Sequence, residues 1–297
     1  MFVKAIEKVG EFTRPIHTIS RAYGSNVVLP GAATLFFINE LGHAITCKHV
    51  ADVIVGAEKI NQTHNKFKSE RAAIPQTNKY NRKLKDLEKN YGYNQDVTAQ
   101  IKNNFINCID KMSAFVIEVH PSEDIALIKF EGFEKLLYKT YATFVKDSSS
   151  IKQGKMLCRL GYPFSEFSNF KYNSNTDDIE WVGEGKQDTP RFPIEGMVTR
   201  NFINNDKKIV GIELSTPGLR GQSGGPLFDQ EGFIYGMQSM THHLHLGFDI
   251  KEKEIREGNK TRKVSNYPFL HLGKCVHADV IKDFLKEKNI KFYESEQ

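Results

Sequence analysis

Three residues of this sequence are of the types that together can cleave an acyl bond. They are His49, Asp124 and Ser223, in that order along the chain. A serine hydroxyl is a poor nucleophile at neutral pH and needs an adjacent base. Histidine suits that task, and a carboxylate can orient the imidazole and stabilise its protonated form. We therefore interpret the three as a candidate base, orienting acid and nucleophile.

The setting of Ser223 favours this interpretation. It lies in the glycine-rich segment Gly221-Gln222-Ser223-Gly224-Gly225, which is followed by Pro226 and an apolar pair. Glycines let a substrate carbonyl approach the backbone, and they permit a turn that aims successive N–H groups at one point. The backbone N–H groups of Gly221 and Ser223 are the candidate oxyanion donors.

Each candidate also has a structural interpretation. His49 could be a packing histidine, and Ser223 could be a turn residue. Asp124 could cap a strand, and Glu123 beside it could be the carboxylate instead. His242, His243 and His245 have no cysteine or carboxylate pattern with them, so we predict solvated loop histidines, no metal site and no cofactor.

Composition limits the protein class. The 297 residues are 39% hydrophobic with 21 Phe, enough for one large β domain or two small ones, and the net charge is +5. No apolar run is long enough to span a membrane. The charged start at Met1 is unlike a signal peptide, and the cysteines lack CxxC spacing. We predict a cytoplasmic protein with reduced thiols at Cys47, Cys108, Cys158 and Cys275.

Short segments rich in β-formers recur along the chain, which predicts an all-β barrel or sandwich. They cover residues 33–38, 43–46, 114–119, 125–130, 156–163, 196–199, 209–214, 227–228 and 233–237. A final amphipathic helix is predicted from Ala278 to Lys288. Residues 164–190 resemble a loop.

Two charged stretches interrupt this pattern. Residues 57–113 carry eleven Lys and Arg against six Asp and Glu, with helix-like segments at 80–89 and 97–109. The basic run from Lys79 to Lys89 is either a solvated helix face or a contact for nucleic acid or an acidic protein. Residues 241–266 form the second stretch, and we predict insertions at both places.

Three segments resemble the chymotrypsin/trypsin-like serine peptidases, most of all their bacterial branch with the HtrA and glutamyl endopeptidase groups. Ile45-Thr46-Cys47-Lys48-His49-Val50 resembles the family's histidine segment, and Glu123-Asp124-Ile125-Ala126-Leu127 its aspartate segment. Arg220-Gly221-Gln222-Ser223-Gly224-Gly225-Pro226 resembles its nucleophile loop.

This resemblance implies a fold and site roles. The chain would be a single domain over 1–297 with two six-stranded β-barrels, about 1–140 and 150–297, and no PDZ domain. His49, Asp124 and Ser223 would be the triad, and Gly221 and Ser223 the oxyanion hole. The substrate pocket would be walled by Thr216, Pro217, Arg220, Gln238, Ser239, Met240 and Thr241.

Departures from the family narrow these implications. Gln222 replaces the aspartate that captures a cut N-terminus, so activation by N-terminal cleavage is not expected. Pro217 replaces trypsin's acidic pocket floor, so cleavage after Lys or Arg is not supported. Gln238 replaces the histidine of glutamyl endopeptidases, which leaves that specificity unsupported as well.

The resulting hypothesis is a serine endopeptidase acting on proteins or peptides through an acyl-enzyme, gated by a regulatory partner or by loop ordering. The alternative is a catalytically silent binding protein or scaffold of the same fold that contacts nucleic acid through the basic insertion. No membrane contact is expected.

Overall fold

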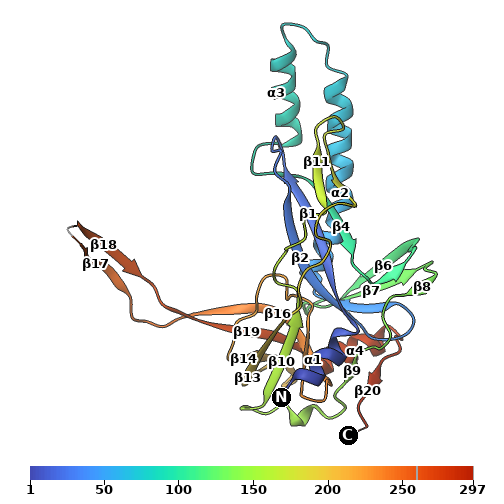
Figure 1. The fold of residues 1–297 in the computed structure, drawn as a ribbon, viewed down its shortest axis with the longest axis vertical. Helices are drawn as coiled ribbons and strands as arrows, with labels where there is room; N and C mark the ends of the chain where they lie inside the picture. The colour runs from blue at the N-terminus through green and yellow to red at the C-terminus, as the bar shows by residue number, and fades with distance from the viewer. Residues whose placement is uncertain (259, 297) are drawn as a thin grey trace.

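The computed structural model describes residues 1–258 and 260–296 (Figure 1). Its first sheet has six antiparallel strands in the order β4-β1-β2-β3-β7-β6. Their bounds are β1 Thr13–Ala22, β2 Leu29–Phe37, β3 His43–Thr46, β4 Thr98–Phe105, β6 Ala114–Val119 and β7 Ala126–Glu131. Within the described ranges no pairing joins β4 to β6, so this sheet is a half-barrel with two open edges.

The second sheet contains a closed ring of six strands, β15-β10-β13-β14-β19-β16, because β15 also pairs with β16. Their bounds are β10 Met156–Gly161, β13 Phe192–Ile203, β14 Ile209–Leu214, β15 Pro226–Phe228, β16 Ile234–His245 and β19 Phe269–His277. The short strands β9 Thr143–Phe144 and β20 Tyr293–Glu294 extend the sheet beyond β16. The predicted all-β, trypsin-like two-barrel fold is confirmed, although the first unit is a half-barrel.

One hydrophobic core runs through both units. Phe36 and Leu127 of the first sheet belong to the same buried cluster as Leu157 and Leu227 of the second. Helices α1 (Val3–Gly10) and α4 (Ala278–Glu287) add apolar side chains to it, and a 3₁₀ turn covers Ser148–Ser150. The predicted C-terminal helix is therefore confirmed. Because the core is shared, the position of one sheet against the other is set by packing.

A helical hairpin rises from the first sheet (Figure 1). It consists of α2 (Lys48–Ala72) and α3 (Tyr80–Tyr91), which confirms the predicted helix over 80–89. The helix expected over 97–109 is wrong: this stretch holds β4, and a two-stranded ladder follows between β5 (Ile109–Asp110) and β8 (Lys135–Leu136). Strand β4 pairs with the edge of β1, and this non-local pairing outweighs the helix propensity of the segment.

The second charged stretch is a β-arm. Strands β16 and β19 remain paired as far as His245 and Phe269, and β17 (Ile250–Glu257) with β18 (Lys260–Asn266) continue the arm away from the barrel (Figure 1). Residues 164–190, expected as a loop, contain the hairpin β11 (Phe170–Asn173) and β12 (Asp178–Trp181). Among the described helices, none is long and apolar enough to cross a membrane.

Asp177, in the β11–β12 turn, ties this hairpin to the rest of the fold. Its carboxylate contacts Arg21 of β1 at 2.6 Å and Arg71 of α2 at 2.8 Å, and it accepts a hydrogen bond from Tyr172. Burial alone would raise the pKa of Asp177, but the hydrogen bond from Arg71 and the charge of Arg21 outweigh it and lower the pKa. The carboxylate therefore holds three chain segments together.

We expect Asp177→Asn to lower the free energy of unfolding by about 3 kcal/mol, because the buried Arg21 loses its carboxylate. Asparagine keeps the size of the side chain and tolerates the positive φ of 48° at this position. Urea denaturation followed by the fluorescence of Trp181, the single tryptophan, measures the change. Asp206→Asn, at an exposed turn, is the matched control, and equal stability of the two variants would contradict the assigned role.

Candidate active site

His49 lies in the first turn of α2, directly after β3. The chain leaves the strand at Thr46, Cys47 is still extended, and the helix begins at Lys48. The N–H groups of a first helical turn have no partner within the helix. Asp124 accepts one of them, because its Oδ1 lies 3.1 Å from the backbone nitrogen of His49. The same carboxylate thus caps the helix and contacts the histidine side chain.

The imidazole of His49 faces Asp124. Its Nδ1 lies 2.9 Å from Asp124 Oδ2 and 3.1 Å from Oδ1. From the second barrel, the hydroxyl of Ser239 donates a hydrogen bond to Oδ2 at 2.5 Å. Asp124, and not its neighbour Glu123, is therefore the carboxylate that the fold places on His49. The side chain of His49 is 52% exposed, which leaves its other edge accessible.

These contacts change both pKa values. The hydrogen bond from His49 to Asp124 raises the pKa of His49 above its ordinary value of 6.5, although burial opposes this. Burial would raise the pKa of Asp124, but the hydrogen bonds from His49 and Ser239 outweigh it and lower the pKa to about 2. At neutral pH the carboxylate is ionised and can stabilise a protonated imidazole.

The turn that carries Ser223 is held by hydrogen bonds from Thr34 of β2. The Thr34 N–H donates to the Ser223 carbonyl at 3.0 Å, and its hydroxyl donates to the Gly221 carbonyl at 2.7 Å. Gly221 has a φ of +91°, and a Cβ there would lie 2.5 Å from the Tyr162 carbonyl oxygen. A side chain at position 221 would therefore disturb the turn, which explains the glycine.

Gln222 also holds this turn. Its buried side-chain oxygen accepts the Leu219 N–H at 3.1 Å, and its side-chain nitrogen donates to the Phe192 carbonyl at 3.1 Å. The sequence interpretation used Gln222 only to exclude zymogen-type activation and missed both this contact and Thr34. In the described part of the chain, neither the Gly221 N–H nor the Ser223 N–H donates a hydrogen bond, so both are available as donors.

The Ser223 hydroxyl has no recorded hydrogen bond to the base in the described part of the chain. It donates a long hydrogen bond of 3.4 Å to the Ser239 carbonyl. Catalytic hydrogen bonds are often long or unformed without substrate. A Ser223–His49 hydrogen bond must therefore form before His49 can take the hydroxyl proton.

The expected pocket walls lie opposite each other. The Thr241 hydroxyl donates to the Gly218 carbonyl at 2.7 Å, and Gln238 packs against Gly218. A β-bulge between Gln238 and Met240 turns Ser239 toward Asp124. Thr216, Pro217 and Met240 lie on the same two chain segments as Gly218 and Gln238, whereas Arg220 is exposed and forms no recorded side-chain contact within the described ranges.

Arg159 of β10 joins the two walls, and the sequence interpretation missed it. Its buried guanidinium contacts Gln238 and Thr216. The available signal was an arginine inside an otherwise apolar strand, Met156 to Gly161. Charged side chains are almost never fully buried without a reason.

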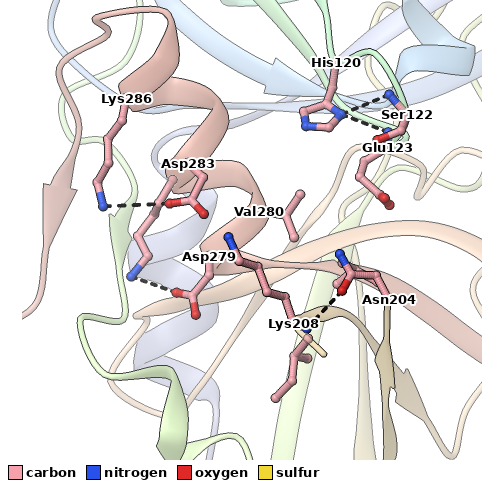
Figure 2. Close-up of a pocket in the computed structure, with 12 residues that line it drawn as sticks. His120, Ser122, Glu123, Asn204, Lys208, Asp279, Val280, Asp283 and Lys286 are labelled. Carbon is pink, nitrogen blue, oxygen red and sulfur yellow. Dashed lines mark hydrogen bonds and ion pairs between the residues drawn. The ribbon is translucent and has the colours of Figure 1, made fainter. Parts of the chain in front are cut away.

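A separate cavity of 550 Å³ lies next to the turn that precedes Asp124 (Figure 2). His120 organises this turn by accepting the N–H groups of Ser122 and Glu123. Figure 2 shows α4 on the opposite side, with Asp279, Asp283 and Lys286. The triad residues do not line this cavity, which carries three carboxylates, three lysines and His120.

The described residues contain one group of three potential metal ligands, Cys47, His49 and Asp124, with ligand atoms within 4.8 Å of one another. Burial, followed by the charge of Asp124, raises the pKa of the Cys47 thiol well above its usual range. A protonated thiol is a poor metal ligand. Its Sγ instead donates to the Gln238 carbonyl at 3.2 Å, so Cys47 fits a packing role.

The surroundings of His49 and His17 shift the pKa values of these two histidines in opposite directions. We expect His49 to titrate above pH 6.5 because Asp124 stabilises its protonated form, and His17 to titrate near pH 4 because burial disfavours its charge. Histidine ring signals followed by NMR across pH measure both, and Asp124→Asn should lower only the value of His49. An unchanged His49 titration in that variant would contradict the assigned contact.

Comparison with known proteins identifies the family of the chain. No curated protein matches the chain. Among solved structures, the HtrA-type protease AlgW with tripeptide is 10% identical with a TM-score of 0.46, and the alignment covers 97% of this chain and 63% of that one. The Rv3671c protease from M. tuberculosis, in its active form, is 13% identical with a TM-score of 0.47 and coverages of 97% and 86%. The chain therefore spans 63% of the AlgW chain.

The family model of the trypsin-like peptidase domain matches residues 33–237, more than half of the sequence, and the chain belongs to this family.

Proposed function

We propose that this protein is a serine endopeptidase that hydrolyses peptide bonds through His49, Asp124 and Ser223. The observation that carries the proposal is the shared Asp124 carboxylate. It binds the His49 imidazole at 2.9 Å and, through Ser239, reaches the strand whose carbonyl accepts the Ser223 hydroxyl. The three residue types are thereby gathered at the junction of the two sheets.

In the proposed reaction, the Ser223 hydroxyl oxygen attacks the scissile carbonyl while His49 Nε2 takes its proton. The resulting oxyanion accepts hydrogen bonds from the N–H groups of Gly221 and Ser223. His49 then passes the proton to the departing amine, which leaves an acyl group on Ser223. Water, deprotonated by His49, attacks the acyl-enzyme and releases the acid and the free serine. Asp124 keeps Nδ1 protonated throughout, so that Nε2 is the nitrogen that takes up and releases the proton at each step.

We further propose that the resting enzyme is gated. The support is that the recorded hydrogen bond of the Ser223 hydroxyl goes to the Ser239 carbonyl, at 3.4 Å, with none to His49 among the described residues. Substrate pairing with Ser239–Thr241, a bound partner or ordering of a nearby loop would change this wall of the site. A hydrogen bond between Ser223 and His49 would then complete the triad.

The first test is labelling with a fluorophosphonate probe. We expect the probe to modify the wild-type chain slowly and to do so faster when an unfolded protein is added. Ser223→Ala should remove labelling completely, because no other described serine has this pairing of base and oxyanion donors. Ser69→Ala, at an exposed position on α2, is the matched control and should label like wild type.

The outcomes separate the parts of the proposal. Fast labelling of the chain alone would contradict gating but support the triad. No labelling under any condition would contradict the peptidase. It would favour the second candidate, a trypsin-like binding protein without turnover, which the missing Ser223–His49 hydrogen bond also fits.

The role of Asp124 is tested by Asp124→Asn. We expect the maximal rate to fall by about 10⁴-fold, because the amide no longer holds the productive imidazole tautomer. In wild type, kcat/KM should rise with pH through a midpoint above 6.5, since the raised pKa belongs to the base and only neutral His49 accepts the proton. A variant that retains wild-type kcat/KM and the same midpoint would show that Asp124 does not act through His49.

A further inference from the structure

Arg159 is the most unusual side chain in the second barrel. It has no exposed surface, yet it carries a permanent positive charge. Its guanidinium forms hydrogen bonds with residues on both of the expected pocket walls. Nη1 donates to Gln238 Oε1 at 2.7 Å, and Nη2 donates to the hydroxyl of Thr216 at 2.6 Å and to its carbonyl at 3.1 Å. A Cβ on Gly273 would lie 2.1 Å from Nη1, so the glycine makes room for the guanidinium.

The charge of Arg159 is not neutralised. Over residues 1–258 and 260–296 its partners are the neutral groups named above, and the ionisable groups that influence its pKa are the thiols of Cys275 and Cys158. Burial lowers that pKa, which reflects the cost of keeping the charge away from water. Buried charges are ordinarily paired. The missing anion is therefore a feature that needs an explanation.

This cluster also has more donors than acceptors. The Nε–H of Arg159 is buried without a partner in the described structure. Gln238 Nε2 donates one N–H to the Met240 carbonyl at 2.8 Å, and its second N–H has no recorded acceptor in the part of the chain described. A ligand that supplies an acceptor oxygen to the second N–H of Gln238 would satisfy that donor and bring negative charge toward Arg159.

Arg159 also sets the direction of the Gln238 amide. A guanidinium only donates hydrogen bonds, so the amide oxygen must face Arg159 and the amide nitrogen must face away. The nitrogen approaches Gly218, where a Cβ would lie only 2.2 Å from it. Thr241 links this wall to Gly218, and the Gly224 N–H donates to the Gln238 carbonyl at 2.9 Å. Gln238 is therefore bonded to the nucleophile turn through its backbone carbonyl, while its side-chain nitrogen faces Gly218.

We propose that Arg159 and Gln238 form the specificity site for an acidic side chain, glutamate or aspartate, on the residue that precedes the scissile bond. The proposal rests on the peptidase function of Ser223. The substrate carboxylate accepts a hydrogen bond from Gln238 Nε2, with the Arg159 charge behind it. The Thr216 hydroxyl, whose own hydrogen goes to the Glu195 carbonyl, holds the guanidinium in place. Cleavage after acidic residues therefore does not require a histidine at position 238.

The charge distinguishes the acid from its neutral isostere. A glutamine side chain could accept the same hydrogen bond, but only a carboxylate neutralises Arg159. A lysine side chain would bring a second positive charge to the site. The expected order of preference is therefore glutamate over glutamine, with lysine poorest.

The experiment uses peptidyl phosphonates that are identical except for glutamate, glutamine, leucine or lysine next to the phosphorus. Their rates of reaction with Ser223 in the full chain report side-chain preference in a single turnover, without a natural substrate. We expect the glutamate probe to react faster than the glutamine probe by on the order of 10- to 100-fold. A generic fluorophosphonate, which carries no peptide, tests the nucleophile separately.

Two variants test the residues. Arg159→Met removes the charge, and Gln238→Glu places a carboxylate on Arg159 while keeping the shape of the side chain. Both should reduce the preference for glutamate over glutamine to about unity. Gln238→Glu also keeps a hydrogen-bond partner for the buried arginine, so the proposal stays testable if Arg159→Met does not fold. Arg200→Met, which removes a largely exposed arginine of the same barrel, should leave the preference unchanged.

Two results would overturn this assignment while the peptidase stands: the wild-type chain reacts with the generic probe but shows no preference for glutamate, or the preference survives Gln238→Glu. Failure of the generic probe to label Ser223 would instead overturn the proposed function, and the specificity assignment with it.

Discussion

The site depends on one carboxylate that is shared between two sheets. Asp124 precedes β7 of the first sheet, where it accepts hydrogen bonds from the backbone and side chain of His49. It also accepts the hydroxyl of Ser239, which lies at a bulge in β16 of the second barrel. An ionised group that is largely removed from water needs such donors. The two units must therefore meet in one register for Asp124 to be satisfied.

Thr34 imposes a second constraint at the same junction. It belongs to the first sheet, but its N–H and hydroxyl hold carbonyl groups on both sides of Gln222 in the second. The nucleophile turn is consequently shaped by contacts from outside its own barrel. The side chain of Gln222 holds the turn as well, through its bonds to Leu219 and Phe192. Thr34 and Gln222 together fix the conformation of the turn, and a free N-terminus takes no part in these contacts.

Two parts of the chain outside this junction project from the sheets (Figure 1). The α2–α3 hairpin extends the first sheet and is tied back by Asp177, and the β16–β19 arm extends the second barrel. Strand β16 carries Gln238 and Ser239 near its start and the arm at its far end. One continuous strand therefore connects the arm to Ser239, the residue that donates to Asp124.

The sequence alone determined the residue types of the site, the all-β class, most strands and the C-terminal helix. These follow from local information: β-forming runs, a glycine turn, and His49 and Asp124 placed beside strands at 43–46 and 126–131. It also allowed Asp124 to be preferred over Glu123. Tertiary structure decided that residues 98–105 form a strand on β1, which local propensity contradicted. It likewise decided that Arg159 meets Gln238, 79 residues away, and that Ser239 meets Asp124, 115 residues away. No local pattern encodes such pairs, because they arise only when packing brings distant strands together and buried polar groups must find partners.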